Sequence, residues 1–232
     1  FLWKFQNLLI WNCVCSKILV SGGDYLAKTI PMIITNNNIL IKDKESDEFK
    51  TFTMPALSVV PNIPFYHQFA ERIAECQYYF KEFMKTIYGK KLSKHIFAII
   101  VPDDTSKLES IFINEFFVNS DACKAVAQMP MALAISKDEN KYVSISKSDR
   151  NIILEYVRNH ESVVTRFYDR NTTNPQKIKE DAKRLHIDLE YESVPIYINN
   201  FNMNMDEYLD FANIITPKQF LEKIAEIDVE KI

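Results

Sequence analysis

Residues that could bind a phosphate through a backbone loop are scarce in this chain. Such loops need glycine, because the backbone must adopt positive φ and approach the ligand closely, which a Cβ atom obstructs. Only three glycines occur in 232 residues, Gly22, Gly23 and Gly89, whereas a soluble protein typically uses about 7% glycine. Gly22 and Gly23, with Asp24 after them, form the one turn of this kind in the sequence. The composition therefore disfavours phosphate binding by glycine-rich loops.

Two groups of carboxylates could do acid–base chemistry or bind cations. Asp103 and Asp104, with Glu109, resemble a set of paired acids. A helix N-cap followed by an acid in the first helical turn explains the same residues more simply. The acids between 206 and 210 could bind a cation, but a solvated cluster at a strand edge explains them as well. Neither group predicts a catalytic site.

The four cysteines and four histidines form no metal-binding pattern. Cys13 and Cys15 are closer together than the usual zinc-binding pair, and no second pair accompanies them. Cys76 and Cys123 lie in apolar stretches, where a thiol is usually buried. The histidines are scattered, and no Ser-His-Asp or Cys-His set stands out. We therefore expect no metal and no catalytic residue.

The overall composition is that of a globular protein without a basic field. Hydrophobic residues make up 47% of the chain and charged residues 25%, with a net charge of -3. A chain of this length can bury a sizeable core. Short basic runs such as Lys90 and Lys91 fit an ordinary solvated surface. The chain therefore has no direct nucleic-acid signature.

The first 17 residues place a single charge, Lys4, before a short apolar run at 8–11, which is followed by a small residue, Ser16. This pattern resembles a secretory signal or a membrane-surface anchor, and it is too short and interrupted for a transmembrane helix. A first strand or helix packed into the core is the alternative. Membrane contact is expected through this segment alone. In a secretory compartment, the sequon at 171–173 would be available for glycosylation.

Strand-like and helix-like segments alternate along the chain. Short apolar runs bounded by turn residues predict strands at 30–34, 39–41, 56–60, 96–101, 122–127, 142–145, 151–157, 162–167, 194–198 and 208–214. Three- and four-residue apolar spacing and capping residues predict helices at 65–88, at 108–116 after a cap at Asp103 or Asp104, at 130–135, at 175–185, and after a Thr216 cap with Pro217 first. Asparagines in 35–38 predict a hairpin. These elements predict an α/β protein without a visible internal repeat.

Several segments resemble the heat-shock-seventy family. The helix-like stretch 80–91 followed by the apolar run 96–101 and Pro102 resembles the family's helix that leads into a buried strand ending in Val-Pro. The segment 124–136 resembles a family helix shared, in altered form, with actin-like bacterial shape proteins. The last third is the most specific part: 174–185 and 196–222 are similar to the family's "NP" helix and to its acidic strand pair with the helix after it.

The resemblance covers about residues 18–225 and is nearest to the large heat-shock-seventy relatives of the cytosol and the endoplasmic reticulum. It implies a reduced actin/heat-shock-seventy-like ATPase fold, α/β in class, with mixed sheets flanked by helices. It further implies a possible signal or anchor at 1–17, a reduced first lobe with the start of the second at 18–168, and a partial second lobe at 169–232.

The family's nucleotide-binding residues are the main point of departure. Its first hairpin carries an Asp-x-Gly turn, but the residues before Gly22 are Val20 and Ser21. Its second phosphate loop is glycine-rich, whereas 142–149 contains no glycine, and Ser144 stands where the Mg²⁺-organising Asp belongs. The region that should supply the catalytic Lys is reduced to 61–64. The matched positions are therefore interpreted as vestiges of a nucleotide site: Gly22, Gly23, Asp24, Ser144, Ser146, Lys147 and Ser148.

Phosphoryl transfer depends on positioning and on electrostatic stabilisation by Lys, Mg²⁺ and backbone N–H groups, so the loss of these groups predicts a non-catalytic protein. The resemblance then implies a co-chaperone of the nucleotide-exchange type, or a structural subunit of a larger assembly. One alternative is a divergent, weak ATPase in which Lys147 and Asp149 substitute for the lost groups, and it alone would require ATP and Mg²⁺. The other alternative is an actin-like filament or scaffold protein.

The expected partner is a protein, either a conventional heat-shock-seventy chaperone or a large assembly. The resemblance to the lumenal relatives, together with the signal-like segment at 1–17, favours the lumen of the endoplasmic reticulum, and the cytoplasm is the alternative. No cofactor is expected outside the ATPase alternative.

Overall fold

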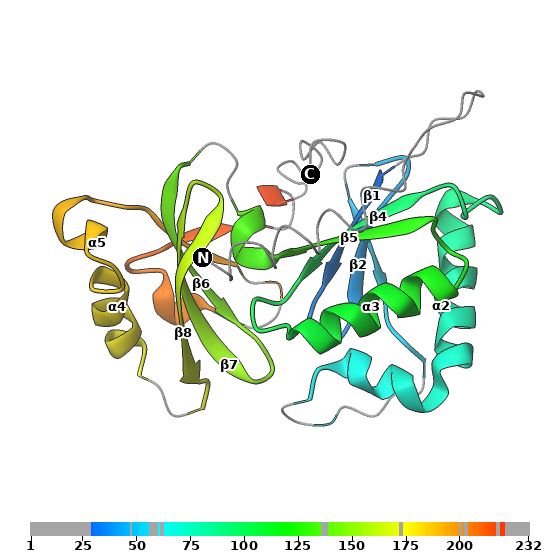
Figure 1. Cartoon of the computed structure of the whole chain (residues 1–232), viewed down its shortest axis with the longest axis horizontal. Coiled ribbons are helices and arrows are strands. Elements are labelled where there is room, and N and C mark those ends of the chain that lie inside the picture. Colours follow the sequence, from blue (N-terminus) through cyan, green and yellow to red (C-terminus); the bar gives the residue numbers. More distant parts are fainter. Residues whose placement is uncertain are drawn as a thin grey trace, which may run out of the picture.

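The structure is a computed structural model that describes residues 29–46, 48–55, 60, 63–135, 139–171, 174–199, 201, 204–216 and 219–220. Two five-stranded sheets stand side by side, and each carries helices on its outer side (Figure 1). The alternation of strands and helices confirms the α/β class. None of the described helices combines the length and hydrophobicity that a bilayer crossing requires.

The first sheet has the strand order β3-β2-β1-β4-β5. Its strands are β1 (Thr29–Ile34), β2 (Ile39–Lys42), β3 (Phe49–Phe52), β4 (Ile96–Val101) and β5 (Ala125–Pro130). The first three form an antiparallel meander, and β4 and β5 extend the sheet in parallel on the other side of β1. A 3-10 helix, η1 (Phe65–Arg72), leads into α2 (Ile73–Tyr88), and α3 (Lys107–Asn119) follows β4.

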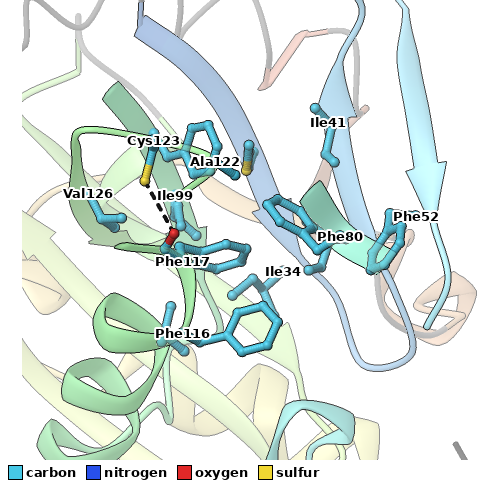
Figure 2. Packing of buried hydrophobic residues seen from close by; sticks show 14 of the residues in the cluster. Ile34, Ile41, Phe52, Phe80, Ile99, Phe116, Phe117, Ala122, Cys123 and Val126 are labelled. Carbon is cyan, nitrogen blue, oxygen red and sulfur yellow. Dashed lines mark hydrogen bonds between the residues drawn. The ribbon is translucent and has the colours of Figure 1, made fainter. Parts of the chain in front are cut away.

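One face of the first sheet is buried beneath α2 and α3 by a cluster of aromatic side chains (Figure 2). Phe80 of α2 is fully buried and makes edge contacts with Phe52, Phe97 and Phe117, at ring-centroid distances of 5.4, 6.0 and 4.9 Å. Edge-to-face pairs of this kind add about 0.5–1.5 kcal/mol each beyond area burial. The helix ends as the sequence predicts, at Gly89, whose φ of +80° is accessible to glycine at little cost.

The second sheet has the strand order β10-β9-β6-β7-β8. Its strands are β6 (Lys141–Lys147), β7 (Asn151–Arg158), β8 (Glu161–Asp169), β9 (Ile196–Asn199) and β10 (Asn213–Ile215). Three helical segments accompany them: α4 (Pro175–Lys183), α5 (Asp188–Tyr191) and η3 (Asp206–Tyr208). An antiparallel meander again comes first, and two parallel strands again lie on the other side of the first strand. The second sheet thus repeats the topology of the first, although the sequence shows no internal repeat.

A third core joins the two sheets. It combines Ile33 and Ile100 from the first sheet with Tyr142 and Val157 from the second, around the short helix η2 (Met131–Ala134). The hydroxyl of the fully buried Tyr142 donates to the carbonyl oxygen of Ala132 at 2.7 Å. The two sheets therefore share buried apolar surface and do not meet only at their edges.

Some predicted elements differ from those in the structure. The predicted helix 65–88 begins as a 3-10 helix, and the predicted strand 208–214 is a strand only at Asn213–Ile215, after the 3-10 turn η3. Thr216 does cap the last helix, in a reciprocal pair of bonds with Gln219. The predicted signal or anchor at 1–17, the strand residues 56–59 and Pro217 lie outside the described residues.

The largest correction concerns the acids after β4. The N-cap of α3 is Ser106, whose hydroxyl accepts from the backbone N–H of Glu109 while the Glu109 carboxylate accepts from the backbone N–H of Ser106. The predicted caps, Asp103 and Asp104, are therefore not needed at the helix. Their carboxylates turn toward the second sheet instead.

Candidate functional site

The predicted nucleotide-site residues fall into two groups in the structure. Ser144, Ser146 and Lys147 lie on β6, and Ser148 begins the turn between β6 and β7. Gly22, Gly23 and Asp24 lie outside the described residues. By topology, the turn that corresponds in the first sheet is the one between β1 and β2, residues Thr35–Asn38. We name Thr35–Asn38 the first turn and Ser148–Asn151 the second turn.

The two turns have the same internal hydrogen bonds. The N–H of Thr35 donates to the carbonyl oxygen of Asn38 at 3.0 Å, and the N–H of Ser148 donates to that of Asn151 at 2.8 Å. The Thr35 hydroxyl accepts from the backbone N–H groups two and three residues on, at 3.4 and 3.2 Å. The Ser148 hydroxyl accepts from its own equivalents, those of Arg150 and Asn151, both at 3.0 Å.

This arrangement bears directly on phosphate binding. A hairpin that binds phosphate presents its backbone N–H groups to the anion as a concave nest. In both turns two of those N–H groups already bond to a side-chain hydroxyl of the same turn, a local bond that Ser and Thr readily make. A phosphate would have to displace these bonds. The hydroxyls therefore occupy backbone N–H groups that a glycine-containing turn leaves available to a phosphate.

The second turn also reaches across to the first sheet (Figure 1). Pro102 ends β4, since proline cannot donate to the sheet, and Asp103 and Asp104 follow at once. The Ser148 hydroxyl contacts Asp104 Oδ2 at 2.5 Å, and the Asp104 side chain is 4% exposed. The same Oδ2 atom accepts from Arg150 Nε at 3.2 Å and from Asn151 Nδ2 at 3.1 Å.

Arg150 connects a second carboxylate to the same cluster. Its Nη1 lies 2.9 Å from Glu109 Oε1, and its Nη2 donates to the carbonyl oxygen of Asp104 at 2.7 Å. His67 of η1 contacts Glu109 Oε1 from the other side at 2.5 Å. Burial alone would raise the pKa of Glu109, but the Ser106 N–H and the Arg150 guanidinium hold it below its usual value. Glu109 is therefore held in its charged form.

Asp103 makes a separate contact between the sheets. Its Oδ2 accepts from the Ser146 hydroxyl of β6 at 2.6 Å, and its Oδ1 accepts from the backbone N–H of Ala132 at 2.6 Å. Burial of the carboxyl group raises the pKa of Asp103 to about 6, despite the lowering effect of these hydrogen bonds and with a further rise from Asp104. We call Asp103, Asp104, Glu109, Ser146, Ser148 and Arg150 the polar junction.

The other predicted residues have different environments. We call each sheet, with the helices that accompany it, a lobe; Lys147 lies 3.3 Å from Glu207 of η3, which belongs to the same second lobe. Ser144 is 1% exposed, and its hydroxyl has no hydrogen-bond partner among the described residues. The residue opposite it on β7 is the buried Glu155. The cluster that the sequence analysis treated as one vestigial site is thus divided between the polar junction, an ion pair and a buried face of the second sheet.

Arg150 and the role of Asp103 and Asp104 were missed from the sequence. Two adjacent acids directly after a buried strand were a usable signal, because the carboxyl end of a parallel strand commonly faces a site. Arg150 gave no signal of its own, since its partners are 41 and 46 residues away in the chain. Among the described residues, no three His, Cys, Asp or Glu side chains come together as metal ligands.

The chemistry available to the polar junction is that of a structural contact. Asp104 and Glu109 are paired with Arg150, and Asp103 is bound by two donors. All of these contacts to the Asp104 carboxylate use Oδ2, while Oδ1 is buried and has no hydrogen-bond partner among the described residues. The arrangement joins the β4–α3 loop to the β6–β7 hairpin, at the position where the two repeated units face each other.

Comparisons with known proteins found similar folds without similar sequences. No protein-family model and no curated protein sequence matches the chain. Among solved structures, MreB5 of Spiroplasma citri bound to ADP is 10% identical, with a TM-score of 0.52 over 88% of this chain and 98% of that one. The ethanolamine utilization protein EutJ from Carboxydothermus hydrogenoformans is 11% identical, with a TM-score of 0.46 over 94% of each chain. At this level of identity the similarity establishes the fold alone: the chain has the predicted actin-like fold, and neither of these two structures is a heat-shock-seventy protein.

Proposed function

We propose that this chain is a non-catalytic, actin-fold scaffold protein whose lobes are joined by its own side chains, without a nucleotide between them. The observation that carries the proposal is the second turn. Ser148 occupies the turn's backbone N–H groups and at the same time contacts Asp104 of the other lobe. A scaffold needs a stable shape and an interaction surface, and it does not need a phosphate site.

The fold similarity supports the scaffold reading better than the co-chaperone reading. MreB5, which this chain resembles in fold, was solved with ADP bound. In this chain the carboxylates and hydroxyls of the polar junction bind one another. If these bonds join the lobes without a nucleotide, the function of a scaffold depends on the shape and the surface of the protein.

Isothermal titration of the full chain with Mg-ATP and Mg-ADP tests the proposal. We expect no heat of binding at nucleotide concentrations up to the millimolar range, and no shift of the thermal unfolding midpoint. Sedimentation velocity with and without Mg-ATP gives the second measurement, in which the distribution of species should be identical. Micromolar binding, or assembly that depends on nucleotide, would show that the divergent ATPase is the correct alternative.

The narrower prediction of a heat-shock-seventy co-chaperone rests on the resemblance of segments such as 80–91 and 174–185. Its test is independent of nucleotide binding by this chain. A purified conventional heat-shock-seventy protein should bind the chain and release its own nucleotide faster. If the exchange rate stays unchanged at saturating concentrations of this chain, the co-chaperone role is excluded and the scaffold role is unaffected.

A further inference from the structure

Glu155 is a carboxyl group buried on the face of the second sheet that is turned toward the first sheet. It is 5% exposed, and it lies on β7 directly opposite Ser144 of β6. The next pair along the same face is Ile153 opposite Ser146. Diagonal neighbours on one face of an antiparallel pair are within about 7–8 Å. Glu155 is therefore a near neighbour of Ser146.

Asp103 contacts the same face of the second sheet, at Ser146. It accepts a hydrogen bond from Ser146 at 2.6 Å, so its carboxyl group is held over the row that contains Glu155. The two acids come from different lobes, Asp103 from the β4–α3 loop and Glu155 from β7. The bond to Ser146 and the strand register place them as neighbours across the lobe junction, and the negative charge of Asp103 raises the pKa of Glu155.

The cations of the junction are used elsewhere. Arg150 is paired with Asp104 and Glu109, and Lys147 is paired with Glu207. In the part of the chain that the structure describes, neither Asp103 nor Glu155 has an ion pair with a Lys, Arg or His side chain. Two buried negative charges without a cation are strongly unfavourable, because a low-dielectric interior does not screen their repulsion. The pair is therefore expected to retain a proton.

The side chain of Ser144 is suited to accept that proton in a hydrogen bond. Its hydroxyl is buried and makes no hydrogen bond among the described residues, although buried polar groups are nearly always paired. A protonated Glu155 is a hydrogen-bond donor, and Ser144 is its cross-strand neighbour. Protonation of Glu155 would thus account for a group that otherwise has no partner.

We propose that Asp103 and Glu155 form a proton-dependent latch between the two lobes. With a proton on Glu155, the pair carries one negative charge instead of two, which burial tolerates better, and the lobes remain joined at β6 and β7. Loss of that proton in mildly alkaline solution places two negative charges together and weakens the bonds from Asp103 to Ser146 and Ala132. The latch does not depend on the scaffold proposal, because it follows from the contacts between the lobes alone.

The pH range follows from the environment of the pair. Burial, and then the charge of Asp103, raises the pKa of Glu155 to about 8, although a hydrogen bond with the Ser162 side chain of β8 acts to lower it. Burial raises the pKa of Asp103 to about 6. A carboxyl group whose pKa is raised on folding stabilises the fold most at pH values below its unfolded pKa, and this stability is lost as the pH rises through the folded value. The other charges facing the pair, Asp104 and Arg150, are already paired with each other.

Hydrogen–deuterium exchange of the full chain between pH 6 and pH 9, corrected for intrinsic exchange, tests the latch. In the wild type we expect protection of 103–109 and 144–156 to fall by about tenfold or more over this range. Glu155→Gln has the same shape and no titrating proton, so its protection should change less than about twofold. Glu161→Gln, at an exposed carboxylate on β8, is the matched control and should behave like the wild type.

A direct titration of the wild type keeps the test decisive if the variant folds poorly. The ¹³C resonance of the Glu155 carboxyl group, assigned with Glu155→Gln where that variant folds and otherwise with Glu155→Asp, should titrate with a midpoint above pH 7. A midpoint below pH 5 would overturn the latch. So would equal pH dependence of exchange in the wild type and Glu155→Gln.

Discussion

The first turn and the second turn have the same internal hydrogen bonds and different surroundings. In each, a hydroxyl at the first position accepts from two backbone N–H groups. Among the described residues, the Thr35 hydroxyl bonds within its own turn, to the carbonyl oxygen and the side chain of Asn38. The Ser148 hydroxyl also lies 3.4 Å from the carbonyl oxygen of Asn151, but its short contact is with Asp104 of the other lobe. The two lobes therefore have equivalent turns with different roles: the first turn stabilises itself, and the second turn also joins the lobes.

The difference shows how a glycine-poor hairpin can be stable. A glycine turn that bound phosphate would gain its stability from the ligand, whereas a Ser or Thr turn satisfies its own N–H groups. The second turn adds Arg150, which holds two carboxylates of the first lobe. If this comparison is correct, substitutions in the second turn should destabilise the protein more than equivalent substitutions in the first.

The largest effect is expected for Arg150→Met. This change leaves Asp104 and Glu109 largely buried without their cation, and breaking a buried ion pair by removing one partner typically costs about 3–5 kcal/mol. The Arg150 side chain is 27% exposed, so solvent moderates the loss. We expect the free energy of unfolding in urea to fall by about 2–3 kcal/mol.

Arg72→Met is the matched control. Arg72 pairs with Glu75 on the surface, three residues away, and both side chains are more than a third exposed. Exposed pairs of this kind contribute little. Equal destabilisation by the two changes would mean that the polar junction does not join the lobes.

A smaller effect is expected when the two turn hydroxyls are removed. Ser148→Ala removes the acceptor for two N–H groups and the hydroxyl that contacts the buried Asp104, so a loss of about 2 kcal/mol is expected. Thr35→Ala removes the acceptor for two N–H groups and a bond to a neighbouring side chain, so about 1 kcal/mol is expected. Chemical denaturation of both variants measures the difference directly. A greater loss at Thr35 than at Ser148 would contradict the proposed division of roles.

The sequence predicted the elements better than the contacts between them. Local patterns were sufficient for α2, because its apolar spacing and Gly89 are contained in a single segment. They were also sufficient for β4, a continuous apolar run. The polar junction was missed because its bonds connect residues more than 40 positions apart, such as Ser146 with Asp103. Asp103 and Asp104 were predicted as helix caps from a local rule, because acids are common N-cap residues. The N-cap in the structure is Ser106 instead.

The turn between β7 and β8 extends the comparison to a turn where glycine would improve stability. Asn159 and His160 have φ values of +52° and +60°, a pair of positive values that two-residue hairpins require. Asn tolerates this conformation, but His, with its Cβ atom, is strained there, whereas Gly is not. His160 is exposed, and its side chain makes no hydrogen bond or ion pair with any of the described residues that the change would remove. We expect His160→Gly to raise the free energy of unfolding by about 0.5–1 kcal/mol, measured by urea denaturation. The same substitution at Ser148, where the side chain bonds to Asp104, should have the opposite sign, and stabilisation at both positions would show that the second turn gains nothing from its hydroxyl.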